Sequence, residues 1–124
     1  MKRIINTEDV IPIISGLVQK ACYELSDNVL DAYKDALKKE ESPYSRDTLK
    51  LLIDNAEFAK KEQIACCHDT GTTVIMMEIG QEISWSGKPL IDQINEGVRI
   101  GYRDGYLRKS IVKDPLDRIN TNDN

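Results

Sequence analysis

The sequence has few of the features that mark a secreted, membrane-spanning or nucleic-acid-binding protein. No apolar run is long enough to cross a bilayer. Asn6, Glu8 and Asp9 interrupt the apolar core that a signal peptide would need. The net charge of −4 argues against general attraction to nucleic acid or acidic membranes. These absences predict a cytoplasmic protein with neither nucleic acid nor a membrane as a partner.

Cysteine is scarce and is not arranged as in disulfide-rich or zinc-binding proteins. Cys22, Cys66 and Cys67 make an odd count, and two of them are neighbours, so a disulfide framework is not expected. The sequence contains no CxxC or HxxxH spacing, which disfavours a self-contained zinc site. The thiols are therefore expected to be reduced and available for metal or redox chemistry.

The first half of the chain has the apolar spacing of amphipathic helices. The pattern i, i+3, i+4, i+7 predicts three of them, with Thr7, Ser26 and Ser45 as caps and a break at Pro43. Their apolar positions are Val10, Ile13, Ile14, Leu17, Ala21 and Leu25, then Val29, Leu30, Tyr33, Ala36 and Leu37, then Leu49, Leu52, Ile53, Ala56 and Ala59. Residues 1–62 should therefore be mainly helical.

The second half changes character after Ile64. Thr72–Ile79 is rich in β-branched residues and lies between glycines, which predicts a strand buried on both faces. A short partner strand is expected at Glu82–Trp85, then a turn at Ser86–Pro89. A helix over Leu90–Arg108 should follow, with Ile91, Ile94, Val98 and Tyr102 facing inward.

The last predicted helix contains a glycine at every fourth position. Gly97, Gly101 and Gly105 would lie along one side and cost about 2–3 kcal/mol relative to alanine. Close approach of another backbone would offset this cost. We predict an α+β fold in one domain over residues 1–124. It comprises a helical part at about 1–62, a motif-bearing small β-sheet with a packed helix at about 63–112, and a loop tail at 113–124.

Reactive side chains are concentrated at Cys66-Cys67-His68-Asp69. Thiolates bind soft metals and iron–sulfur clusters, and the Asp-Thr-Gly-Thr that follows is typical of a turn. Neighbours on an extended segment point in opposite directions, so one cysteine at most should face a given site. The same geometry makes a Cys67–His68 nucleophile pair unfavourable. Buried structural thiols, a hydrogen-bonded histidine and an ordinary turn aspartate are the simpler alternatives.

The stretch CHDTGTTVIMMEIGQ resembles the cysteine–glutamine–aspartate–threonine–glycine–threonine signature of class I iron–sulfur hydro-lyases. These are the class I fumarases and the alpha subunits of L-tartrate dehydratase and two-subunit fumarases. The resemblance extends upstream to ACYELSDNVLDAYKDALKKEES. Downstream it includes the blocks at Gly97–Ser110 and VKDPLDRINTNDN, so it covers nearly the whole chain.

The resemblance implies that water is reversibly added to or removed from a small dicarboxylate. The reaction would be the hydration of fumarate to malate or the dehydration of tartrate to oxaloacetate. In such enzymes three cysteines hold a [4Fe–4S] cluster whose open iron acts as a Lewis acid. By this resemblance Cys67 is a cluster ligand and Asp69 is catalytic. His68, Asp69 and Arg108 bind substrate, whereas Cys22 and Cys66 are structural. His68 replaces the family's glutamine, and it can carry charge near neutral pH.

The family's further cysteines, its base and other arginines have no counterpart here. By resemblance they are expected beyond Asn124 and in a beta subunit or C-terminal half, with a homo-oligomer or heterotetramer as the assembly. The 124-residue chain alone is expected to lack the cluster and to be inactive. The alternative function is a non-catalytic subunit-interaction or regulatory domain of the same fold.

Overall fold

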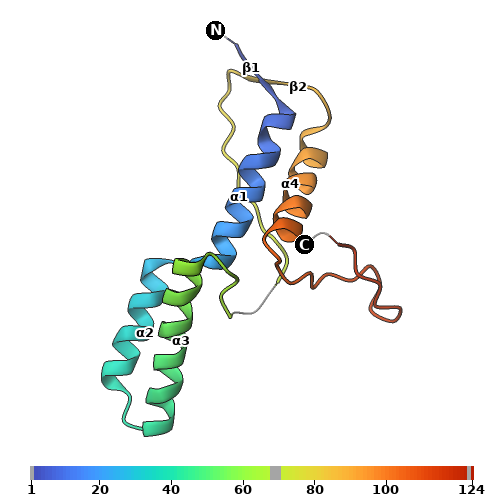
Figure 1. The fold of residues 1–124 in the computed structure, drawn as a ribbon. Coiled ribbons are helices and arrows are strands. Elements are labelled where there is room, and N and C mark those ends of the chain that lie inside the picture. Colours follow the sequence, from blue (N-terminus) through green and yellow to red (C-terminus); the bar gives the residue numbers. More distant parts are fainter. Residues whose placement is uncertain (1, 68–70, 123) are drawn as a thin grey trace. The chain divides into compact units, whose positions relative to one another are not determined.

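The computed structural model describes residues 2–67, 71–122 and 124. Its elements are β1 (Arg3–Asn6), a 3-10 turn (Thr7–Asp9), α1 (Val10–Tyr23), α2 (Asp27–Lys39), α3 (Pro43–Glu62), β2 (Ile83–Ser86) and α4 (Leu90–Asp104), as Figure 1 shows. The chain divides into two compact units, residues 1–19 with 70–124 and residues 20–69. Helices combined with a small sheet confirm the predicted α+β class.

The sheet of the first unit pairs two short strands that are far apart in the sequence. β1 and β2 run parallel, with Arg3 opposite Ile83 and Asn6 opposite Ser86. The short strand near Glu82–Trp85 was predicted, but its partner was expected to be Thr72–Ile79. β1 was missed because a four-residue strand shows too little alternation to separate it from the start of a helix.

Thr7 joins the start of α1 to the turn after β2. Its side chain is almost fully buried, at 1% exposure, and its hydroxyl lies 2.8 Å from the Lys88 carbonyl oxygen and 3.1 Å from that of Ser86. The predicted capping role of Thr7 belongs instead to Asn6, whose side chain accepts from the Glu8 N–H. Between the two carbonyls, Gly87 adopts a φ of 95°, a conformation that favours glycine.

Replacing Thr7 with valine is expected to destabilise the chain by about 1–3 kcal/mol. Valine keeps the volume but removes the hydroxyl donor, so that the Ser86 and Lys88 carbonyl groups lose the hydrogen bonds they accept from the buried Thr7 side chain. Urea unfolding followed by circular dichroism measures the change, and Thr7→Ser is the control because it retains the hydroxyl. Equal stability for the valine variant and the parent would show that these hydrogen bonds contribute nothing net.

Helix α4 packs directly on the first part of α1, and Figure 1 shows the two helices side by side. A Cβ atom placed on Gly97 would lie 2.9 Å from the Ile11 carbonyl oxygen, and one on Gly101 would lie 2.9 Å from that of Ser15. The predicted close backbone approach is thus confirmed at both glycines. The helix ends at Asp104 rather than Arg108, because Gly105 caps it.

The inward face predicted for α4 is partly wrong. Val98 and Tyr102 are buried as expected, but Ile91 is 65% exposed. Gln93 is buried in its place, at 5% exposure. The apolar stripe therefore begins one turn later than the periodicity indicates.

The prediction of a buried strand at Thr72–Ile79 is wrong. Among the described residues this segment is extended but pairs with no strand, and Met76 is 92% exposed. Its β-branched composition favours the extended backbone, but a strand buried on both faces also needs neighbouring strands and covering helices. In the described part of the first unit, the sheet contains only β1 and β2, so it does not carry the motif.

The second unit contains the hairpin of α2 and α3, which lie side by side in Figure 1. Ala56 and Ala59 form its buried centre, with Leu25 and Leu30 packed against them. The predicted cap at Ser45 is wrong, because α3 begins at Pro43 with Ser42 as N-cap. Proline suits the first helical position since its missing N–H would have no partner there.

The segment after α4 is folded back on itself. Its N–H and carbonyl groups form bonds between Lys113 and Ile119 and between Thr121 and Ile111, beside a bridge between Val112 and Asn120. The tail predicted as a loop therefore contains a short hairpin-like turn. No helix in the described ranges is both long and apolar enough to span a bilayer.

Candidate functional site

The two adjacent cysteines occupy opposite environments within the second unit. Cys66 is 7% exposed and packs with Ala56 and Ala59, whereas Cys67 is exposed to solvent. This confirms that neighbouring thiols on an extended segment point apart. Cys67 is thus the cysteine that an external metal could reach.

The backbone of the cysteine pair is fixed by hydrogen bonds on both sides. The Cys66 N–H donates to the Cys22 carbonyl oxygen at 2.8 Å. The Asn55 amide oxygen accepts from the Cys67 N–H at 2.8 Å and from the Cys66 thiol at 3.3 Å. Burial raises the pKa of the Cys66 thiol, and the nearby Cys67 adds to the effect, so the proton needed for this bond is retained. Cys66 is therefore a buried, hydrogen-bonded thiol, as its expected structural role requires.

Among the three cysteines that the structure describes, Cys67 is exposed, Cys22 is half-buried and Cys66 is buried. Such clusters are held by several cysteine thiolates, and in the described ranges no three His, Cys, Asp or Glu side chains converge as a metal site. Exposed Cys67 fits a single cluster ligand by its chemistry and accessibility. His68 and Asp69, predicted for substrate binding and catalysis, lie outside the described residues, as does Thr70.

Arg108 lies in the first unit, just after α4, with its side chain exposed. The chain there is held by Leu107, whose N–H donates to the Tyr102 carbonyl oxygen at 3.0 Å. The Asn124 side-chain amide donates to the Arg108 carbonyl oxygen at 3.2 Å. Arg108 thus has a fixed backbone and a side chain that extends into solvent.

The arginines of α4 differ from Arg108 in their partners. Arg99 forms an ion pair with Glu96, and Arg103 forms one with Asp104. The bonded arginine lowers the pKa of each carboxyl. No carboxylate within the described ranges pairs with Arg108. Arg108 thus differs from Arg99 and Arg103 in that no ion pair to it is found among the described residues.

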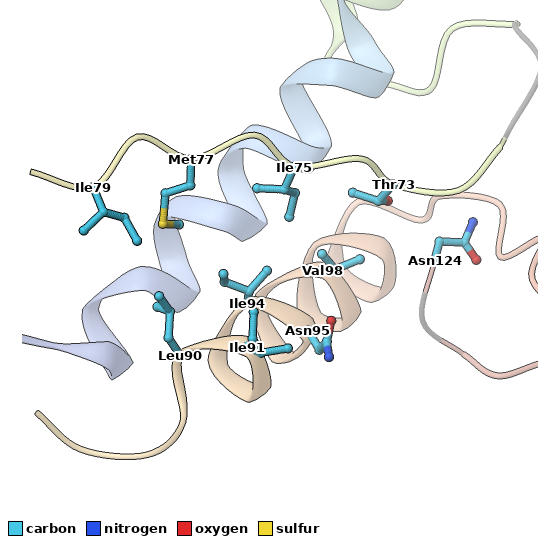
Figure 2. Close-up of a pocket in the computed structure, with 10 residues that line it drawn as sticks. All are labelled: Thr73, Ile75, Met77, Ile79, Leu90, Ile91, Ile94, Asn95, Val98 and Asn124. Carbon is cyan, nitrogen blue, oxygen red and sulfur yellow. The ribbon is translucent and has the colours of Figure 1, made fainter. Parts of the chain in front are cut away.

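An open groove of about 350 Å³ lies elsewhere in the first unit, between α4 and the extended segment after Gly71. Figure 2 shows Ile75, Met77 and Ile79 pointing toward Leu90 and Ile94 of α4. No side chain that lines it carries a charge. A dicarboxylate needs cationic and hydrogen-bonding partners, so this apolar groove is not suited to that substrate.

The comparisons with known proteins agree with the signature around Cys67. A family model described as fumarate hydratase (Fumerase) matches residues 11–124. The chain is 35% identical over 109 residues to the "Putative L(+)-tartrate dehydratase subunit alpha" of Methanocaldococcus jannaschii. That match covers 87% of this chain and 38% of the relative.

The chain therefore spans less than half the length of the curated relative that it matches. The family match, by contrast, includes both Cys67 and Arg108 and extends across both compact units. The chain belongs to the fumarate hydratase (Fumerase) family.

Proposed function

We propose that this chain is the N-terminal part of a [4Fe–4S] hydro-lyase that reversibly adds or removes water on a small dicarboxylate. The observation that carries the proposal is the exposed Cys67 at the start of the family signature, beside a buried and hydrogen-bonded Cys66. Fumarate and malate, or tartrate and oxaloacetate, are the proposed substrate pairs. The name of the M. jannaschii relative supports the tartrate pair.

The proposed roles divide the chemistry among three groups. Cys67 would be one ligand of the cluster, which when bound supplies a Lewis acid for the hydroxyl that leaves. Arg108 and His68 would hold the substrate carboxylates and limit their movement. Asp69 would take part in proton transfer near the reacting carbons.

The remaining ligands and the base are proposed to come from other parts of the enzyme. A beta subunit or C-terminal half is the partner, since the relative is named as an alpha subunit. The assembly would be a homo-oligomer or heterotetramer in the cytoplasm. The 124-residue chain by itself would be inactive, because one thiolate is too few for a cluster.

Anaerobic reconstitution of the full-length gene product with iron and sulfide tests the proposed function. The expected product contains iron and sulfide and, with its partner subunit, hydrates fumarate or dehydrates L-tartrate. The 124-residue chain should show neither activity. A full-length complex that assembles but hydrates and dehydrates none of these acids would favour a non-catalytic interaction role.

Replacing Arg108 with alanine is expected to raise the KM for the dicarboxylate by roughly 10- to 100-fold, as the loss of a charged hydrogen bond predicts. Steady-state kinetics of the reconstituted enzyme measure the effect. Arg103→Ala is the matched control, since that guanidinium is already paired with Asp104. If both variants change KM equally, Arg108 has no special contact with substrate.

A further inference from the structure

The amide oxygen of Asn55 lies where two donors from the cysteine pair converge. A backbone N–H can only donate, so the Asn55 atom 2.8 Å from the Cys67 nitrogen is an acceptor, its carbonyl oxygen. That oxygen has a second lone pair, which takes the Cys66 thiol. Asn55 thus uses both acceptor sites on two consecutive residues.

The end of α3 explains why Asn55, eleven positions before Cys66, is the side chain that reaches this pair. Gln63 adopts a left-handed conformation with φ 54° and ψ 50°, and the Ile64 N–H donates to the Ala59 carbonyl oxygen at 3.1 Å. This reverses the chain along its own helix. From Asn55 to Gln63 the helix rises by eight residues, about 12 Å. The three extended residues from Gln63 to Cys66 run about 10 Å in the opposite direction, which brings Cys66 back beside Asn55.

Several contacts hold the backbone of the cysteine pair and the Cys66 side chain. The Cys66 N–H and thiol are bonded, its side chain is buried, and the Cys67 N–H is bonded. Only the Cys67 side chain is exposed. The backbone that carries this thiol is therefore held in place before any metal binds.

We propose that Asn55 is a positioning residue for Cys67, acting through the Cys67 backbone. This inference rests on the proposed function, in which Cys67 is a cluster ligand. Partners that orient a metal ligand reduce the ordering needed for binding, and their loss lowers metal affinity about 10- to 100-fold. Asn55 would act in this way without touching the metal or the substrate.

Four variants of the full-length gene product test the proposal. Asn55→Leu removes the acceptor, and Asn55→Gln displaces it by one methylene. Asn55→Asp keeps an acceptor oxygen at the same reach. Asp54→Leu is the matched control, because Asp54 is the exposed neighbour on the same helix.

The measurements are iron and sulfide per chain after anaerobic reconstitution, and the electron paramagnetic resonance spectrum of the reduced cluster. The Leu and Gln variants are expected to lose about 10-fold or more in iron affinity and to show an altered spectrum. The Asp variant and the Asp54 control should resemble the parent. If Asn55→Leu does not fold, the comparison of Asn55→Gln with Asn55→Asp tests the proposal. Equal iron affinity for these two variants would overturn it.

Cys67→Ser, measured in parallel, separates the two ideas. If that variant keeps a normal cluster, the proposed function fails. If it loses the cluster while Asn55→Leu and Asn55→Gln match the parent in iron affinity and spectrum, only the positioning role is overturned.

Discussion

Replacing Cys67 with serine is expected to lower the hydro-lyase activity of the reconstituted full-length enzyme by more than about a hundredfold. Loss of an orienting partner alone costs a metal site up to about that factor, and Cys67 is proposed as a direct ligand. A serine hydroxyl is a harder donor and does not substitute for a thiolate at iron–sulfur iron. Iron content should fall with activity.

Cys66→Ala is the matched control for this substitution. It also removes one thiol from the same pair, but that thiol is buried and bonded to Asn55. The control should lose some stability while it keeps iron and activity. The assignment of Cys67 as the ligand would be wrong if Cys67→Ser kept the iron content of the parent. It would also be wrong if Cys66→Ala, and not Cys67→Ser, lost all its iron.

Replacing Gly97 or Gly101 with alanine is expected to destabilise the chain by about 1–3 kcal/mol. Alanine is normally favoured over glycine in a helix by about 1 kcal/mol. Here the added methyl group would lie 2.8 Å from the Ile14 Cβ at Gly97 and 2.9 Å from the Ser15 carbonyl oxygen at Gly101. These are backbone and near-backbone atoms, so α1 and α4 must separate, and the cost of overpacking exceeds the gain in helix propensity.

Replacing Gly16 with alanine, in the facing helix α1, is expected to stabilise the chain rather than destabilise it. Gly16 lies inside α1, and a Cβ atom there would have nothing within 4 Å. This variant should gain up to about 1 kcal/mol. Denaturant unfolding of the three variants measures the contrast, and stabilisation by alanine at all three positions would show that the helices do not pack as described.

The sequence predicts those parts of the fold that depend on local pattern. Helical periodicity identified four helices, and the spacing of Gly97 and Gly101 indicated a close helix contact that the structure confirms. The same reasoning failed for Thr72–Ile79, because a strand depends on partners distant in sequence. The parallel pairing of β1 with β2 joins residues about 80 positions apart and leaves no local signal.

In the candidate site too, features that depend on local sequence were predicted and those that depend on distant contacts were not. Alternation along an extended segment predicted that Cys66 and Cys67 would face different ways, and they do. Asn55 could not be identified, since it is an ordinary polar position in a helix. Its importance depends on the reversal of the chain at Gln63, where glycine would be the usual signal for a left-handed residue.

The central claim, that the Cys67 thiolate binds iron, is tested most directly by alkylation before and after reconstitution. The full-length protein is treated with iodoacetamide under anaerobic conditions, and the labelled fraction of Cys67 is measured by mass spectrometry. We expect rapid labelling without iron and strong protection once the cluster is assembled. Equal labelling of Cys67 in the two states, with iron and sulfide bound, would contradict the account.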